Sequence, residues 1–119
     1  MLTVDANNTI VLTKGDSGSI TVAFTDSSGN TYDASGDTVE FGVKRNVYDA
    51  ECVLKKTVEN GTTLTFTPED TEDIEGYGDF LYDIQITHVT EAQDETEEDV
   101  TEIWTPIAAA KFVLGWNVL

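Results

Sequence analysis

His88 is the only histidine of this 119-residue chain, so a Ser-His-Asp hydrolase built from this sequence would have to use it as the general base. That chemistry also needs a nucleophile exposed at a sharp turn, and the sequence has no G-x-S-x-G segment to provide one. A glycosidase needs only two carboxyl groups across a cleft, but such a pair is uninformative among 23 Asp and Glu residues. We therefore interpret His88 as a strand-end histidine and predict neither a catalytic residue nor an enzyme.

Carboxylates on loops are the other candidates for a chemical role, because Ca²⁺ binds oxygen ligands. Asp70 and Asp73 lie at a proline-started corner, and the segment 91–99 reads EAQDETEED. The EF-hand spacing D-x-[DN]-x-[DN]-G with its distal Glu is absent, and a run of like charges is typical of a solvated loop. We expect a solvated loop or a long hairpin tip at 91–99, and we assign no metal and no cofactor.

Two tryptophans are candidates for contact with a partner. Trp104 stands beside Pro106, and Trp116 lies near the C-terminus in an apolar tail. Exposed aromatic side chains often anchor interfaces, although either ring can instead complete the core. The residues that we predict for interaction are these two rings and the acids of the 91–99 loop, namely Asp94, Glu95, Glu97, Glu98 and Asp99.

The charge balance restricts the class of partner. The chain has 6 Lys and Arg against 23 Asp and Glu, which gives a net charge of −17. Nucleic-acid binding draws much of its affinity from basic residues that neutralise phosphates, so this surface repels nucleic acid and anionic lipid alike. We expect neither partner. The negative charge has three possible interpretations: high solubility, a basic protein partner or a salt-adapted source.

Cysteine usage and hydropathy suggest a soluble protein folded in the cytosol. Cys52 is the only cysteine, so no internal disulfide forms, and we expect its side chain to be buried beside Leu54. The N-terminus lacks the long apolar run of a signal peptide, and no window approaches the ~20 apolar residues of a membrane span.

Alternating apolar residues predict a series of β-strands separated by turns. Asn60-Gly61 is the strongest hairpin signal, since a type I′ turn needs positive φ at both central residues. Pro68 ends one strand and starts a short helical turn, after which we expect the Ile74 side chain to be buried in the core. The predicted strands cover residues 9–13, 19–25, 38–45, 51–58, 80–88 and 100–114. A returning strand through Leu64 and Phe66 ends at Pro68, and a further hairpin lies near residues 29 and 30.

The patterning predicts which side of each strand faces the core. Phe80, Tyr82, Ile84, Ile86 and His88 share one parity and form the expected inner face of their strand. Lys55 and Lys56 favour an exposed edge strand, and Pro106 favours an edge or a bulge. We therefore predict one all-β domain over residues 1–119, an immunoglobulin-like two-sheet antiparallel β-sandwich of seven or eight strands.

Four segments carry a resemblance to a known family. They are KGDSGSITVAFTDSSGNTYDASGDTVEFGVKR, TFTPEDTEDI, GDFLYDIQIT and KFVLG. Together they resemble the immunoglobulin-like N-terminal domain of phage baseplate upper proteins, a group common in tailed phages and prophages of Gram-positive bacteria. The resemblance covers about residues 14–112. Its sharpest marks are Gly15-Asp16, the turn before residues 38–41, the corner Pro68–Thr71 and Tyr82-Asp83-Ile84.

Members of that family are virion components that pack against other tail or baseplate proteins and help to carry host-binding fibres. The resemblance implies a non-enzymatic phage or prophage virion structural protein, a baseplate or tail adaptor or a decoration module, assembled in the host cytoplasm through protein–protein contacts. Homo-oligomer formation is left open. The 91–99 connection is longer than is usual in the family, whose proteins continue past this domain, whereas this sequence ends at Leu119. The alternative is a cell-surface adhesion or carbohydrate-binding β-sandwich module that uses its acidic loops to bind calcium.

Overall fold

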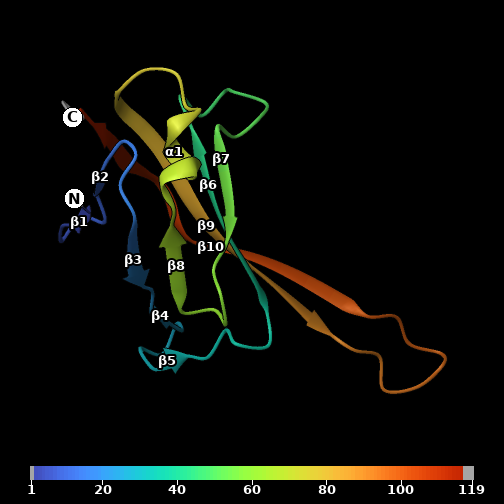
Figure 1. Ribbon diagram of the computed structural model, residues 1–119. Coiled ribbons are helices and arrows are strands. Elements are labelled where there is room, and N and C mark those ends of the chain that lie inside the picture. The colour runs from blue at the N-terminus through green and yellow to red at the C-terminus, as the bar shows by residue number, and fades with distance from the viewer. Residues whose placement is uncertain (1, 117–119) are drawn as a thin grey trace.

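The protein is built almost entirely from β-strands, which confirms the predicted all-β class (Figure 1). The computed structural model describes residues 2–116. The elements are β1 Leu2–Val4, β2 Ile10–Thr13, β3 Gly18–Thr21, β4 Phe24–Thr25, β5 Thr31–Tyr32, β6 Thr38–Lys44, β7 Leu54–Thr57, β8 Thr63–Phe66, α1 Pro68–Glu72, β9 Gly78–Thr90 and β10 Val100–Gly115. These strands outnumber the predicted seven or eight because β1 is additional and the predicted strand 19–25 divides into β3 and β4. The short strands β4 and β5 form the hairpin predicted near residues 29 and 30.

Six strands form the main sheet, in the order β1-β2-β10-β9-β6-β7. All neighbours are antiparallel except β2 and β10, which run parallel. The register between β6 and β9 pairs Phe41 with Ile84 and Gly42 with Asp83, so each face of the sheet keeps one parity from both strands. We call the face that carries Phe41 the inner face and the face that carries Gly42 the outer face.

The inner face holds the core. The rings of Phe41, Phe66 and Phe112 are fully buried, and Phe66 of β8 lies 5.6 Å from Phe41 and 6.0 Å from Phe112, measured between ring centroids. These contacts pack the two-stranded sheet β3-β8 against the main sheet. Phe80, Tyr82, Ile84 and Ile86 are also buried, as their parity predicts, and Ile74 fills the core below α1. The outer face has no comparable layer over it in the part of the chain that is described.

The turns form where local chemistry allows them. Asn60 and Gly61 adopt φ of 54° and 70°, as the type I′ prediction requires, although β7 and β8 on either side belong to different sheets. Gly61 also lies against Ala34, because a Cβ there would come within 2.6 Å of the Ala34 carbonyl oxygen. The turn therefore fixes where the chain crosses between sheets.

The corner at α1 is tied to the N-terminal half of the chain. Thr67 and Asp70 form a capping box, in which the Asp70 carboxylate accepts a hydrogen bond from the Thr67 backbone N–H at 2.7 Å. Asp70 also pairs with Lys56 at 2.6 Å. The Gly15 N–H donates to the buried Thr71 hydroxyl at 2.8 Å. Two marks of the family resemblance, the Gly15 turn and the Pro68–Thr71 corner, are thus in direct contact.

Strand β10 follows β9 through two bulges. Thr105 and Pro106 together oppose Gln85, and Ala108 and Ala109 together oppose Asp83. Each bulge adds one residue, so inward positions fall at Trp104, Ile107 and Ala110 before the ordinary alternation resumes. Ala109 adopts φ of 52°, and its N–H donates to Asp83 Oδ1 at 2.5 Å. The bulge expected at Pro106 is present, and a second one follows it.

One prediction about side-chain burial is wrong, and one side chain of an edge strand faces inward. Cys52 is exposed, because β7 starts only at Leu54 and Cys52 lies in the preceding loop on the outer face. Lys56 faces inward and has 19% of its side chain exposed, because the parity that exposes Lys55 turns Lys56 toward Asp70 of α1. The expected edge position of β7 is confirmed by the strand order.

Candidate interaction surface

The last two strands run beyond the sheet and form a projecting arm (Figure 1). We define the arm as residues 88–103, because Thr87 is the last residue of β9 that pairs with β6. The arm lengthens the molecule to 59 × 30 × 23 Å and gives a Cα radius of gyration of 16.1 Å. A compact domain of this length has about 13.5 Å. The acidic segment 91–99 is the tip of this hairpin, as predicted.

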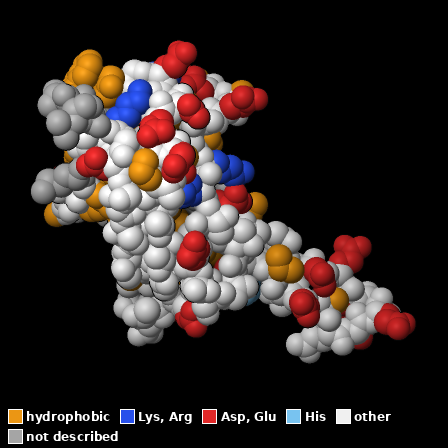
Figure 2. Space-filling model, in the orientation of Figure 1, with side chains coloured by type: hydrophobic (Ala, Val, Ile, Leu, Met, Phe, Trp, Pro, Cys, Tyr) orange, Lys and Arg blue, Asp and Glu red, His pale blue; other side chains and the backbone are white. Residues whose placement is uncertain are grey.

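The arm combines exposed apolar side chains with a uniformly acidic composition (Figure 2). Val89, Val100 and Ile103 are 48%, 53% and 62% exposed. Seven carboxylates lie on the arm, and the sequence has no Lys or Arg between Lys56 and Lys111. Cross-strand pairing places Val89 and Ile103 on the continuation of the outer face, and Val100 and Glu102 on the continuation of the inner face.

Several carboxylates of the tip are used to shape its backbone. Asp94 accepts hydrogen bonds from the N–H and the hydroxyl of Thr96 at 2.8 and 2.6 Å, and these bonds lower the pKa of Asp94. Asp99 accepts the Ala92 N–H at 2.8 Å across the loop. Since acceptors that close local turns are common in loops, these contacts explain the tip's shape without a ligand. Among the residues described, no three His, Cys, Asp or Glu side chains come close enough to hold a metal ion.

A cluster of polar and aromatic side chains fastens the root of the arm to the body. His88 Nδ1 lies 2.7 Å from Asp37 Oδ1, and the Tyr32 hydroxyl donates to Asp37 Oδ2. The Trp104 ring stacks on His88 with centroids 5.5 Å apart, and it meets the edge of Tyr32 at 5.6 Å. We call Tyr32, Asp37, His88 and Trp104 the root cluster. It joins the two strands of the arm to the β4–β6 region of the body.

Charge and hydrogen bonding in the root cluster shift two pKa values. The hydrogen bond to Asp37, followed by burial, raises the pKa of Tyr32 to about 12. Burial alone would raise the pKa of Asp37, but hydrogen bonds from Tyr32 and His88 outweigh it and hold that pKa below its ordinary value. Asp37 therefore stays ionised between a phenol that keeps its proton and a histidine ring. The cluster places a carboxylate against an imidazole ring, and it includes no Ser, Thr or Cys side chain.

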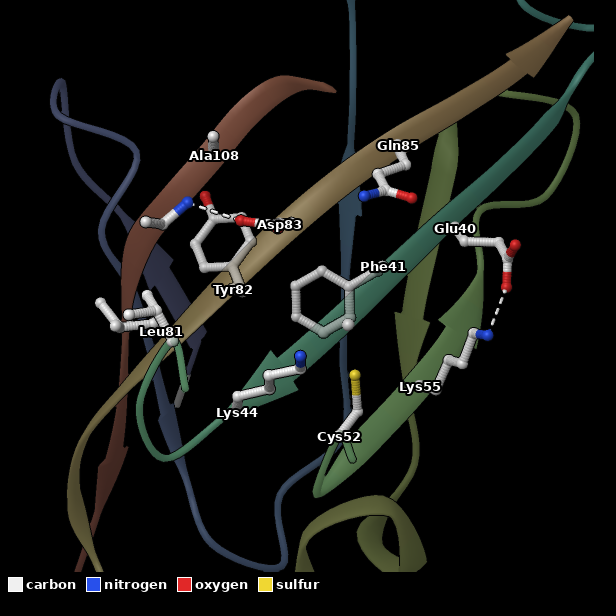
Figure 3. A pocket seen from close by; sticks show the side chains of 13 residues that line it. Glu40, Phe41, Lys44, Cys52, Lys55, Leu81, Tyr82, Asp83, Gln85 and Ala108 are labelled. Atoms are coloured by element: carbon white, nitrogen blue, oxygen red, sulfur yellow. Dashed lines mark hydrogen bonds and ion pairs between the residues drawn. The ribbon is translucent and has the colours of Figure 1, made fainter. Parts of the chain in front are cut away.

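The outer face carries a groove of about 350 Å³ beside the arm (Figure 3). Gly42 lies at its floor, and a Cβ there would come within 3.0 Å of Cys52 Sγ. The loop residues Val47 and Cys52 form one side, and the bulge at Ala108 and Ala109 forms the other. The charged side chains around the groove are Glu40, Lys44, Lys55 and Asp83. Glu40 pairs with Lys55 at 3.2 Å, and Asp83 accepts the hydrogen bond from the Ala109 N–H in the bulge.

The structure places the predicted interaction residues at two ends of the molecule. Asp94, Glu95, Glu97, Glu98 and Asp99 are all exposed at the tip, and Trp104 is 37% exposed at the root of the same arm. Trp116 lies beyond the other end of β10, where its ring stacks on Tyr77 with centroids 3.9 Å apart. The five acids therefore lie together at the tip, Trp104 lies at the root of the arm, and Trp116 lies apart from both. Tail residues 117–119 lie outside the described residues.

The root cluster and the groove were not predicted from the sequence. Asp37 and His88 are 51 positions apart, and no local motif connects them. The signal that could have found them is the pairing of residues 38–44 with 81–87, because that register places Asp37 and His88 one position beyond the same end of the ladder. The groove depends on the second bulge, and a run of three alanines does not mark where a bulge forms.

Comparison with protein-family models, with curated proteins and with solved structures finds no match to this chain. Within the described residues, the helices include none with the length and apolar character needed to cross a membrane.

Proposed function

We propose that this protein is a non-enzymatic structural component of a phage or prophage virion, an adaptor or decoration module of the tail or baseplate that works through protein–protein contacts. The fold that we propose for it is an immunoglobulin-like sandwich. Support comes from the strand order β2-β10-β9-β6-β7 with β2 and β10 parallel, and from the separate pair β3-β8 packed on the inner face. The family resemblance noted in the sequence supports the phage assignment.

The observation that carries the proposal is the arm. A two-stranded ribbon with exposed Val89, Val100 and Ile103 leaves apolar surface in water, which is unfavourable unless a partner covers it. The acidic tip adds a field that favours partners with basic surfaces and repels anionic ones. The root cluster orients the ribbon, so that less conformational freedom is lost when a partner binds.

The test is co-purification with the tail-module proteins encoded beside this chain, using wild type and a shortened arm. In the shortened variant, residues 90–100 are replaced by Asn-Gly, which joins the paired residues Val89 and Thr101 by a two-residue hairpin turn. We expect the variant to keep the melting temperature of the wild type and to lose the partner.

A length-matched control separates the tip's charge from its shape. Asn or Gln replaces Asp94, Glu95, Glu97, Glu98 and Asp99, and the arm keeps its length. If the control binds the partner more weakly than wild type in low salt but equally well in high salt, the acids act by charge steering. A wild-type chain that captures none of the neighbouring tail proteins, or a shortened variant that binds them undiminished, contradicts the proposal.

A further inference from the structure

The outer face differs in charge from the rest of the molecule. Its strand residues include three bases and three acids, so the face has no net charge. The remaining 3 of the 6 basic residues and 20 of the 23 acidic residues lie elsewhere, and they carry the whole net charge of −17. The outer-face charges are Lys44, Lys55, Lys111, Glu40, Asp79 and Asp83.

Charge balance limits what this face can bind. A strongly basic partner would gain more from the acidic remainder of the molecule than from a neutral face. A second copy of this chain is itself acidic, so like charges repel it from every surface except the neutral outer face. The outer face is therefore the surface on which two copies can meet at least electrostatic cost.

The arm supplies a group that fits the groove. Val89 and Ile103 continue the outer face and project past the body, and the arm has no Lys or Arg that would repel Lys44 and Lys55. The arm cannot fill its own groove, because β9 and the bulge of β10 themselves form part of the groove. Where an arm of this kind occupies the groove, it belongs to another molecule.

We propose that the outer face binds a second copy of this chain, with the arm of each copy lying in the groove of the other. Val89 and Ile103 of one copy contact the groove between Cys52 and the Ala108-Ala109 bulge of its partner. The two contacts are related by a two-fold axis, so the assembly closes at two copies. This self-association involves the outer side of the arm and leaves Val100, Glu102 and the tip acids for other proteins.

Cysteine cross-linking tests the contact directly, because Cys52 is the only cysteine and lines the groove. Thr101→Cys adds a second thiol on the outer side of the arm, opposite Val89. Mild oxidation should then give a species of two copies linked between residues 52 and 101, identified by peptide mapping. Val4→Cys is the control, at a similarly exposed position in β1. Cross-linking of the control as efficient as that of Thr101→Cys overturns the proposal, and a ladder of longer species overturns the two-fold arrangement.

Sedimentation of the protein without added thiols gives an independent readout. We expect a monomer–dimer equilibrium that weakens about tenfold or more in Ile103→Glu, which would bury a carboxylate, and that is unchanged in Val4→Glu. Because the copies repel each other overall, raising the salt concentration should strengthen the dimer, whereas binding of a basic partner would weaken. A wild-type monomer at every concentration and salt overturns the proposal. No tail protein is needed, so this test fails or succeeds independently of the proposed function.

Discussion

The body and the arm are made by the same two strands, yet they are stabilised differently. From Leu81 to Thr87, β9 lies between β6 and β10, and it buries every second side chain in the core up to Ile86. Beyond His88 the same strand has only β10 beside it, and within the described residues no layer covers either face. Hydrophobic burial therefore stabilises the body, whereas the arm depends on ladder hydrogen bonds and its root. The strands β9 and β10 are therefore longer than the packed core requires, and the excess length remains exposed.

The largest expected contrast comes from removing one apolar side chain in each region. Phe41→Ala deletes a fully buried ring that contacts Phe66, Tyr82 and Phe112, and should lower the free energy of unfolding by about 3–5 kcal/mol. Ile103→Ala removes a side chain that is 62% exposed and should change it by less than ~0.5 kcal/mol. Urea unfolding measures both. Comparable losses would mean that the arm is part of the core.

The root cluster can be tested through the ionisation of Tyr32. Its pKa of about 12 depends first on the hydrogen bond to Asp37, so Asp37→Asn should return the pKa toward 10. Because folding raises this pKa, its contribution to stability is complete below pH 10 and is lost as the pH rises through 12. Tyrosinate absorbance of wild type and Asp37→Asn, each with a Tyr32→Phe reference, isolates this one titration. An unchanged Tyr32 midpoint in Asp37→Asn would remove Asp37 from the joint between arm and body.

Two aspartates with lowered pKa values, one in the body and one at the tip of the arm, give a further contrast in stability. Asp70 is partly buried, and although burial opposes ionisation, Lys56 and the Thr67 N–H lower its pKa. Asp70→Ala should cost about 1–2 kcal/mol, because it removes the cap and the ion pair. Asp94→Ala, at the exposed tip, should leave the unfolding midpoint unchanged.

The Asp70 effect has a defined pH dependence. Folding lowers this pKa, so its contribution is present above the ordinary Asp value of 3.8 and is lost as the pH falls through the lowered pKa of the folded protein. The difference between wild type and Asp70→Ala in urea unfolding should therefore shrink on acidification. A difference that stays constant into strong acid would contradict the assigned role of the carboxylate.

The smallest effect concerns the bulge between the groove and the arm. Ala109 has φ of 52°, a conformation that costs an L-residue about 1–2 kcal/mol and glycine little. After the entropy cost of glycine, Ala109→Gly should raise the free energy of unfolding by roughly 0.5 kcal/mol. Ala108→Gly in the same bulge gains no such relief and should lower it by about 0.5–1 kcal/mol. Equal effects of the two substitutions would mean that the positive φ stores no strain.

Local chemistry made much of the body predictable. Alternation identified the buried faces of β6 and β9, the Asn60-Gly61 pair identified its turn, and Pro68 identified the start of α1. The prediction for Cys52 was wrong because parity was extended into a segment that is a loop. The edge position predicted from Lys55 and Lys56 is confirmed, although Lys56 faces inward because its partner Asp70 lies there.

The all-β class, the acidic field and the polar segment at 91–99 could be predicted, because they depend on composition and on neighbours along the chain. Three features arise only when the chain folds: the extension of β9 and β10 past β6, the contact between Asp37 and His88, and the groove on the neutral outer face. Those features depend on the register between strands far apart in sequence. Register is set by how the whole core packs, and a single strand's pattern does not contain it.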